Sequence, residues 1–128
     1  CVRGVYGGTV GQGSHGSLGR AAPRNFMAAI GPDFKAGYAD PAPVSTADIA
    51  PTMARLAGLD LPAKGRLKGR VITEALTGGA EPHVTRRTIR SAPAANGLAT
   101  VLDMQQVGEA RYFDAAGFTG RVIGLAAK

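Results

Sequence analysis

The chain is poor in the large apolar side chains that fill a protein core, and this limits what it can fold into. Its hydrophobic fraction is 45%, but much of that is alanine, and the 128 residues include four Phe and no Trp. A chain of this length suits a single domain with one modest core. With so few bulky side chains, that core must be thin. We therefore expect that the chain does not bury its apolar surface alone.

The first apolar run is Asn25-Phe-Met-Ala-Ala-Ile30, which follows a loop rich in Gly and Ser over residues 1–22. Gly31-Pro32 closes the run, and this stop, together with its short length, favours a strand over a helix. Because the run is apolar along its length, we expect it to be covered on both faces. Residues 33–43 carry two prolines and are predicted to be irregular.

The strongest helix signal begins at Ser45, which has Asp48 three residues later in the pattern of a capping box. Gly58 is placed to end this helix. Four apolar residues recur at helical spacing and predict one buried face: Ile49, Met53, Leu56 and Ala57.

The rest of the chain reads as a basic, glycine-spaced loop over 60–69, a short helix over 71–76, and then β structure. Gly108-Glu109 is predicted to be the turn of a hairpin. The predicted strands are 87–92, 98–107, 110–114 and 121–125. A strand, a helix and a hairpin argue for an α/β or α+β fold.

The net charge of +6 comes from basic residues that are scattered rather than striped, apart from Lys64-Gly-Arg-Leu-Lys-Gly-Arg70 and Arg86-Arg87…Arg90. Such charge is typical of a solvated surface and also favours anionic substrates. No nucleic-acid reading motif is present, and no apolar run is long enough for a membrane span. One cysteine excludes an internal disulfide. Because it is residue 1, without a Met, we expect a piece of a longer protein, or else a processed product.

One of the two histidines, His15, lies in the glycine-rich stretch Gly11-Gln-Gly-Ser-His-Gly16. These residues match the G-x-G-x-x-G dinucleotide fingerprint, but no apolar strand precedes them and no amphipathic helix follows, so we reject that interpretation. Taken by itself, the stretch is either a flexible surface loop or a setting in which a histidine can bind a metal or move protons. The second histidine, His83, is predicted to be a solvated loop residue.

Several stretches form a pattern when they are taken together. They are Gly13-Ser-His-Gly16, Ile30-Gly-Pro-Asp-Phe34, Pro43-Val-Ser-Thr-Ala-Asp-Ile-Ala-Pro-Thr52, Leu56-Ala-Gly58 and Arg111-Tyr-Phe-Asp-Ala-Ala-Gly-Phe118. This pattern resembles the C-terminal part of the alkaline phosphatase superfamily, and most of all its type I phosphodiesterase/nucleotide pyrophosphatase branch. The resemblance covers nearly the whole chain. It implies that residues 1–128 are an incomplete catalytic domain, the C-terminal portion of an α/β/α sandwich with a terminal β-hairpin.

The resemblance also implies a function, the hydrolysis of phosphate esters at a site with two metal ions, usually zinc. The histidine of the late motif is a metal ligand in that family, and it corresponds to His15. The implied nucleophile, a Thr or Ser, lies upstream in the family, so the chain alone is expected to be inactive. Thr9 and Ser14 are candidates by residue type only. The chain has Gly16-Ser-Leu-Gly19 where eukaryotic-type members continue Gly-Tyr-Asp-Asn, so the substrate stays open.

The implied partners are the missing N-terminal part of the same protein, a phosphate-ester substrate and a second copy of the chain. A periplasmic or secreted location is favoured by the resemblance alone. The alternative function is that of a non-catalytic basic module that binds anions or another protein and lacks an active site.

Overall fold

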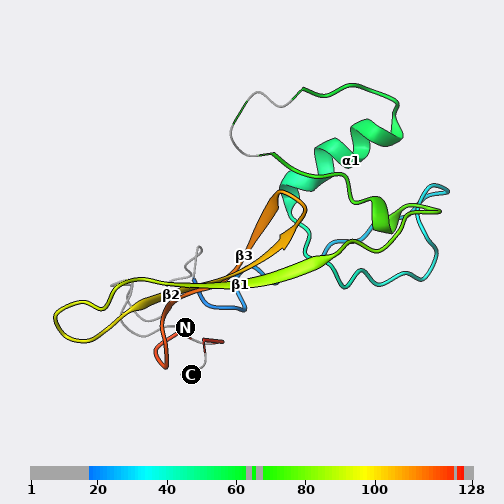
Figure 1. The fold of residues 1–128 in the computed structure, drawn as a ribbon. Coiled ribbons are helices and arrows are strands. Elements are labelled where there is room, and N and C mark those ends of the chain that lie inside the picture. The colour runs from blue at the N-terminus through cyan, green and yellow to red at the C-terminus, as the bar shows by residue number, and fades with distance from the viewer. Residues whose placement is uncertain (1–17, 63–64, 66–67, 123, 126–128) are drawn as a thin grey trace, which may run out of the picture. The chain divides into compact units, whose positions relative to one another are not determined.

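The computed structural model describes residues 18–62, 65, 68–122 and 124–125 (Figure 1). Within them the chain forms one short helix, α1 (Ile49–Leu56), and three strands, β1 (Val84–Arg90), β2 (Thr100–Val107) and β3 (Ala110–Phe118). Two short 3-10 helices of one turn each occur at Thr46–Asp48 and Thr73–Ala75. The fold is therefore mixed α/β, with an antiparallel sheet. No helix in this described part has the length and apolarity needed to cross a membrane.

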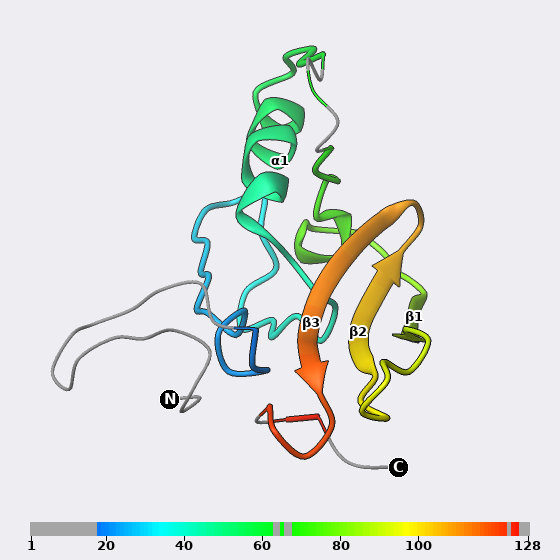
Figure 2. The ribbon, with the colours of Figure 1, turned by 90° about the vertical axis from the view of Figure 1, so that its left-hand side faces the viewer.

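The sheet has the strand order β1-β2-β3, so β2 is central and both other strands are edges (Figure 2). Gly108-Glu109 makes the two-residue turn between β2 and β3, as predicted, and Gly108 has a positive φ of 55°. Such tight turns favour residues that tolerate positive φ. β2 and β3 confirm the predicted hairpin. β1 begins three residues earlier than the predicted strand 87–92, because the β-branched residues Val84 and Thr85 belong to it.

The prediction of a last strand over 121–125 is wrong. The N–H groups of Arg121 and Val122 both donate to the carbonyl of Phe118 at 3.1 Å, and that of Leu125 donates to Val122 at 3.1 Å. These local bonds make turns, so the backbone groups are satisfied without a neighbouring strand. Leu125 is instead buried against Val101 and Ala115 of the sheet.

Helix α1 begins and ends as the sequence predicts. The capping box is present, with the Ser45 hydroxyl accepting from the N–H of Ala47 and the Asp48 carboxylate accepting from the N–H of Ser45 at 2.8 Å. At the other end Gly58 has a φ of 66°. The N–H groups of Gly58 and Leu59 bond back to the carbonyls of Arg55 and Ala54 in a Schellman pattern.

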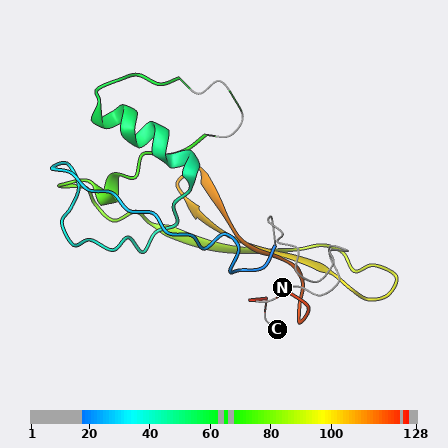
Figure 3. The same cartoon turned by 180° about the vertical axis from the view of Figure 1, so that it is seen from behind.

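The predicted buried face of this helix is wrong. Ile49 and Met53 are 44% and 54% exposed, and the buried residues are Asp48 and Thr52. The helix is held through hydrogen bonds to the segment that follows it rather than through its apolar side chains. Figures 1 and 3 show this segment, which precedes the turn at Thr73–Ala75, running beside α1.

The predicted strand over residues 25–30 is also wrong. This segment has no regular secondary structure and no strand partner among the described residues, and all of it is exposed. Phe26 is 87% exposed and Ile30 is 99% exposed. A strand needs a neighbouring strand to pair its backbone groups, and the three described strands do not supply one.

The chain divides into two compact units, which we describe separately. Unit 1 consists of Cys1–Phe26, Arg86–Met104 and Phe113–Lys128, and unit 2 consists of Met27–Thr85 and Gln105–Tyr112. The described core of unit 1 is small, with Val122 packed on the buried residues Val101, Ala115 and Leu125. In unit 2 the buried apolar residues are Ala42, Ile72, Val107 and Tyr112. The thin core that the composition predicts is thus seen in both units.

Candidate functional site

The candidate metal ligand His15 lies outside the described residues, as do Thr9 and Ser14. Across residues 18–62, 65, 68–122 and 124–125, no group of three or more His, Cys, Asp or Glu side chains is placed to hold a metal ion. His83 is exposed in the loop directly before β1, which confirms the prediction made for it.

The most organised group of functional side chains in the described structure lies in unit 2. We call it the buried polar cluster, and it consists of Asp48, Thr52, Arg70, Glu74 and Tyr112. Glu74 and Asp48 are the largest fully buried side chains of the described chain, at 0% and 1% exposure. Buried charges require partners, because an ion without one loses its hydration and gains nothing in return.

Asp48 is fully engaged. Its Oδ2 accepts hydrogen bonds from the N–H of Ser45 at 2.8 Å and from the hydroxyl of Tyr112 at 3.0 Å. Its Oδ1 accepts from the backbone N–H of Arg70 at 2.8 Å. One carboxylate therefore caps the helix start and also binds two segments that follow later in the chain.

Thr52 lies one helical turn after Asp48 and connects α1 to the same following segment. Its hydroxyl donates to the Asp48 carbonyl at 2.7 Å and accepts from the N–H of Ile72 at 3.0 Å. Gly69 allows this close approach, because a Cβ at that position would collide with the carbonyl of Ala47. The backbone at 69–72 thus lies against the start of α1.

Arg70 uses every N–H of its guanidinium. Its Nε donates to the Tyr112 hydroxyl at 2.8 Å, and its two Nη atoms form a bidentate ion pair with Glu74. The same Nη atoms also donate to the carbonyls of Val71 at 3.4 Å and Pro43 at 3.1 Å. Since no donor is left over, Arg70 in this arrangement holds the fold and is not available to an external anion.

The electrostatics of the cluster fix its charge state at neutral pH. Burial raises the pKa of Tyr112 to about 12, with the hydrogen bond to Asp48 adding to the shift, so the phenol stays neutral. Burial, the largest single influence, would raise the pKa of Glu74, but the hydrogen bonds to its carboxylate and the positive charge of Arg70 together outweigh burial, so the pKa is lowered. The cluster is therefore an Arg⁺–Glu⁻ pair beside a neutral tyrosine.

Asp40 lies next to this cluster and is less well satisfied. Its Oδ1 accepts from the N–H of Ala42 at 2.9 Å, and the Tyr38 hydroxyl, which donates its one proton to Glu81 at 2.7 Å, lies 3.5 Å away. Its Oδ2 is buried without a hydrogen-bond partner. Burial, together with the negative charge of Glu74, raises the pKa of Asp40 above its ordinary value.

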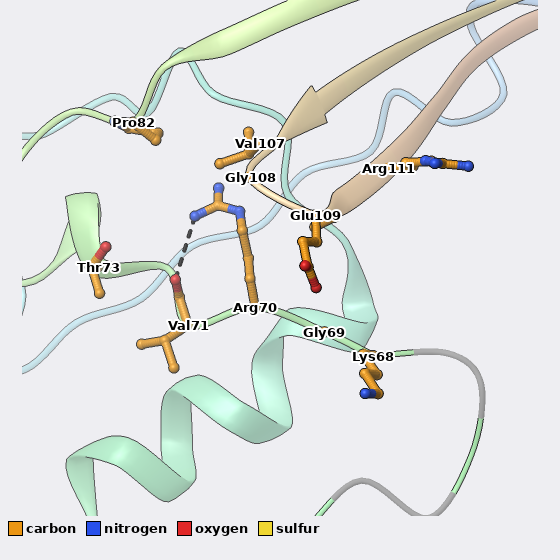
Figure 4. A pocket seen from close by; sticks show the side chains of 11 residues that line it. Lys68, Gly69, Arg70, Val71, Thr73, Pro82, Val107, Gly108, Glu109 and Arg111 are labelled. Carbon is orange, nitrogen blue, oxygen red and sulfur yellow. Dashed lines mark hydrogen bonds between the residues drawn. The ribbon is translucent and has the colours of Figure 1, made fainter.

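A hollow of about 740 Å³ opens beside the cluster in unit 2 (Figure 4). The side chain of Arg70 lies between those of Val71 and Glu109, whereas the side chain of Arg111 points away from them. Besides these four residues, the hollow is lined by Lys68, Gly69, Thr73, Pro82, Val107, Gly108 and Ala110. The Arg70 donors are already occupied, and the other charged groups of the lining are the cations Lys68 and Arg111 and the anion Glu109.

Comparison with known proteins adds no relative. No protein-family model matches the chain, and no curated protein or solved structure is significantly similar to it.

Sequence reasoning identified Asp48 as a capping residue but missed the rest of the buried polar cluster. The spacing of Arg70 and Glu74, four residues apart, is a signal for an ion pair. No local signal points to Tyr112, because its partners Asp48 and Arg70 precede it by 64 and 42 residues.

Proposed function

We propose that the chain is the C-terminal part of an alkaline-phosphatase-like α/β/α catalytic domain. In this proposal the complete protein is a zinc-dependent hydrolase of phosphate esters, in the manner of type I phosphodiesterases and nucleotide pyrophosphatases, and His15 is one of its metal ligands. The observation that carries the proposal is the motif Gly13-Ser-His-Gly16, followed by the long pattern Pro43-Val-Ser-Thr-Ala-Asp-Ile-Ala-Pro-Thr52.

In the structure, residues of the second half of this pattern hold the local fold together. Asp48 and Thr52 bind the backbone of the following segment, and the carbonyl of Pro43 accepts from Arg70. Gly58 ends the helix that they anchor. All four residues have structural roles, so the second half of the pattern builds a scaffold. In this proposal, metal binding belongs to the glycine-rich segment around His15.

The side chain of His15 suits the metal that the resemblance implies, because neutral imidazole is a good zinc ligand. Zinc, when bound, supplies Lewis-acid stabilisation of the charge that develops during phosphoryl transfer. A zinc site takes three or four protein ligands, so His15 needs further ligands, which the resemblance implies lie upstream of this chain. The isolated chain is accordingly expected to show no phosphodiesterase activity.

The test compares two histidine variants of the full protein that contains this chain. His15→Ala should lower both the zinc content and the hydrolysis of a chromogenic phosphodiester. His83→Ala is the matched control and should change neither, because this exposed loop residue has no role in the proposal. Unchanged zinc content and turnover in His15→Ala would overturn the metal-ligand assignment.

A second candidate function is a non-catalytic, basic, anion-binding module. The observation that favours it is the charge of unit 1, whose described residues hold six arginines and two acidic residues. The sequence before Cys1 in the encoded protein separates the two candidates. The hydrolase requires an early Asp, a Thr or Ser nucleophile and an Asp-His pair there, whereas the binding module requires none of them.

A further inference from the structure

The basic residues of unit 1 have almost no acidic partners within that unit. Its two described acidic residues, Asp103 and Asp114, both pair with Arg20, at 2.9 and 3.4 Å. The remaining described arginines of the unit form no salt bridge with any described residue. Three of them, Arg86, Arg87 and Arg90, lie on the single strand β1.

β1 is an edge strand, and its residues from 85 to 90 are all exposed. The N–H of Ser91, just after the strand, donates to the carbonyl of Thr100 on the β2 side at 2.9 Å. In an antiparallel pair, alternate residues direct their backbone groups toward the same neighbour. The backbone groups of Arg86, Thr88 and Arg90 therefore point away from β2, where no described residue bonds to them.

The side chains of β1 place positive charge on both faces of the sheet. Successive side chains of a strand alternate between the faces, so Arg86 and Arg90 share one face and Arg87 lies on the other. Ile89, which shares the face of Arg87, is 44% exposed and offers apolar contact beside this charge. β1 thus combines a backbone edge that no described residue pairs with and positive charges on each side of it.

We propose that the outer edge of β1, from Arg86 to Arg90, docks an acidic peptide segment that adds to the sheet as a fourth strand. An exposed strand edge is a template for another strand, and main-chain bonds then supply affinity while side chains supply specificity. The charge selects an acidic partner, because arginines without internal partners gain from carboxylates placed opposite them. A flexible polyanion that lies on one face would meet only part of this charge and none of the backbone groups.

The experiment measures binding of a labelled peptide of repeated Glu-Glu-Thr, as long as the 7 residues of β1, to the 128-residue chain. As a strand, this peptide carries carboxylates on both faces. Fluorescence anisotropy at low salt should show saturable binding that weakens as salt screens the charges. Arg86→Glu with Arg90→Glu should weaken binding by about tenfold or more, since cross-strand charge pairs become repulsive. Arg24→Glu with Arg121→Glu changes the net charge equally at exposed sites off β1 and should have a much smaller effect.

Two further probes separate strand addition from simple charge attraction. The same peptide with N-methyl groups on every backbone amide has neither of its edges free to pair with β1 and should not bind. Inorganic polyphosphate should bind more weakly than the unmethylated peptide. Equal binding of the methylated peptide or of polyphosphate, or equal weakening in the Arg24/Arg121 variant, would overturn the proposal. In the wild-type chain, the peptide should also slow amide exchange at Arg86, Thr88 and Arg90, and unchanged exchange there would contradict it.

Discussion

The hydroxyl of Tyr112 donates a hydrogen bond of 3.0 Å to Oδ2 of Asp48, which lies 64 residues earlier in the chain. The same hydroxyl accepts from Nε of Arg70 at 2.8 Å. One phenol oxygen therefore connects β3, the start of α1 and the segment between them. Because a tyrosine hydroxyl both donates and accepts, no apolar side chain of similar size can replace it here.

Tyr112→Phe should lower the stability of unit 2. The change removes the acceptor of Arg70 Nε, which is half-buried, and one of the donors to Asp48, which is fully buried. We expect a loss of about 1–3 kcal/mol in the free energy of unfolding, the usual cost of leaving a buried polar group unpaired. Urea unfolding followed by circular dichroism measures it. Tyr38→Phe is the control, because its bond to Glu81 is exposed, and an equal loss in both variants would argue against the network.

Glu74→Gln should be more damaging. It leaves the Arg70 charge in place and removes the carboxylate that neutralises it, at a residue with 0% exposure. Breaking one side of a buried ion pair costs about 3–5 kcal/mol. The matched control is Glu109→Gln, an exposed residue of the turn between β2 and β3. If both variants unfold at the wild-type urea midpoint, Arg70 and Glu74 do not stabilise the fold.

Asp40→Asn should stabilise the chain at neutral pH. The raised pKa of Asp40 means that the folded state favours its protonated form, so its contribution to stability is present below its ordinary value of 3.8. That contribution is lost as the pH rises through the folded-state value. An Asn stays neutral throughout and keeps an acceptor for the N–H of Ala42.

Thermal unfolding across a pH series tests this. The midpoint of Asp40→Asn should exceed that of wild type near pH 7, and the two should converge in acid, below the ordinary Asp value. Asp60→Asn serves as the control because Asp60 is exposed and has no described hydrogen bond through its side chain. A wild-type midpoint above that of Asp40→Asn at neutral pH would show that ionised Asp40 stabilises the fold.

The chain is expected to self-associate through its exposed apolar residues. Residues 25–30 and the open face of α1 together expose Phe26, Ile30, Ile49 and Met53. Light scattering over a range of concentrations should show species larger than a monomer. Phe26→Ser with Ile30→Ser should shift the distribution toward monomer more than Leu59→Ser with Leu61→Ser, which changes exposed leucines after α1. A monomer at every concentration would contradict this expectation.

The elements that sequence reasoning predicted well are those whose signals are local. The Ser45–Asp48 capping box, the helix end at Gly58 and the turn at Gly108-Glu109 each depend on a few neighbouring residues, and all three are present. Caps and tight turns are determined by backbone groups close in sequence, so one sequence is enough to find them.

The failures depend on distant partners. Periodicity shows that Ile49 and Met53 share a face, but it does not show whether anything covers that face. The apolar segment 25–30 likewise lacks a described strand beside it. The buried polar cluster could not be predicted as a whole, because its hydrogen bonds join residues up to 64 positions apart. The metal-ligand hypothesis for His15 concerns residues outside the described structure and stays a prediction.

The bond between Tyr112 and Asp48 also sets an order of events during biosynthesis. A ribosome adds Asp48 and Arg70 long before Tyr112, and chains fold as they emerge, from the N-terminus onward. Until Tyr112 emerges, Asp48 and Arg70 each lack one of the bonds that hold them in the finished unit. A premature stop codon between Glu74 and Tyr112 would therefore leave a product with the whole of α1 but without a closed unit 2. Such a truncated product is a natural substrate for the cell's proteases.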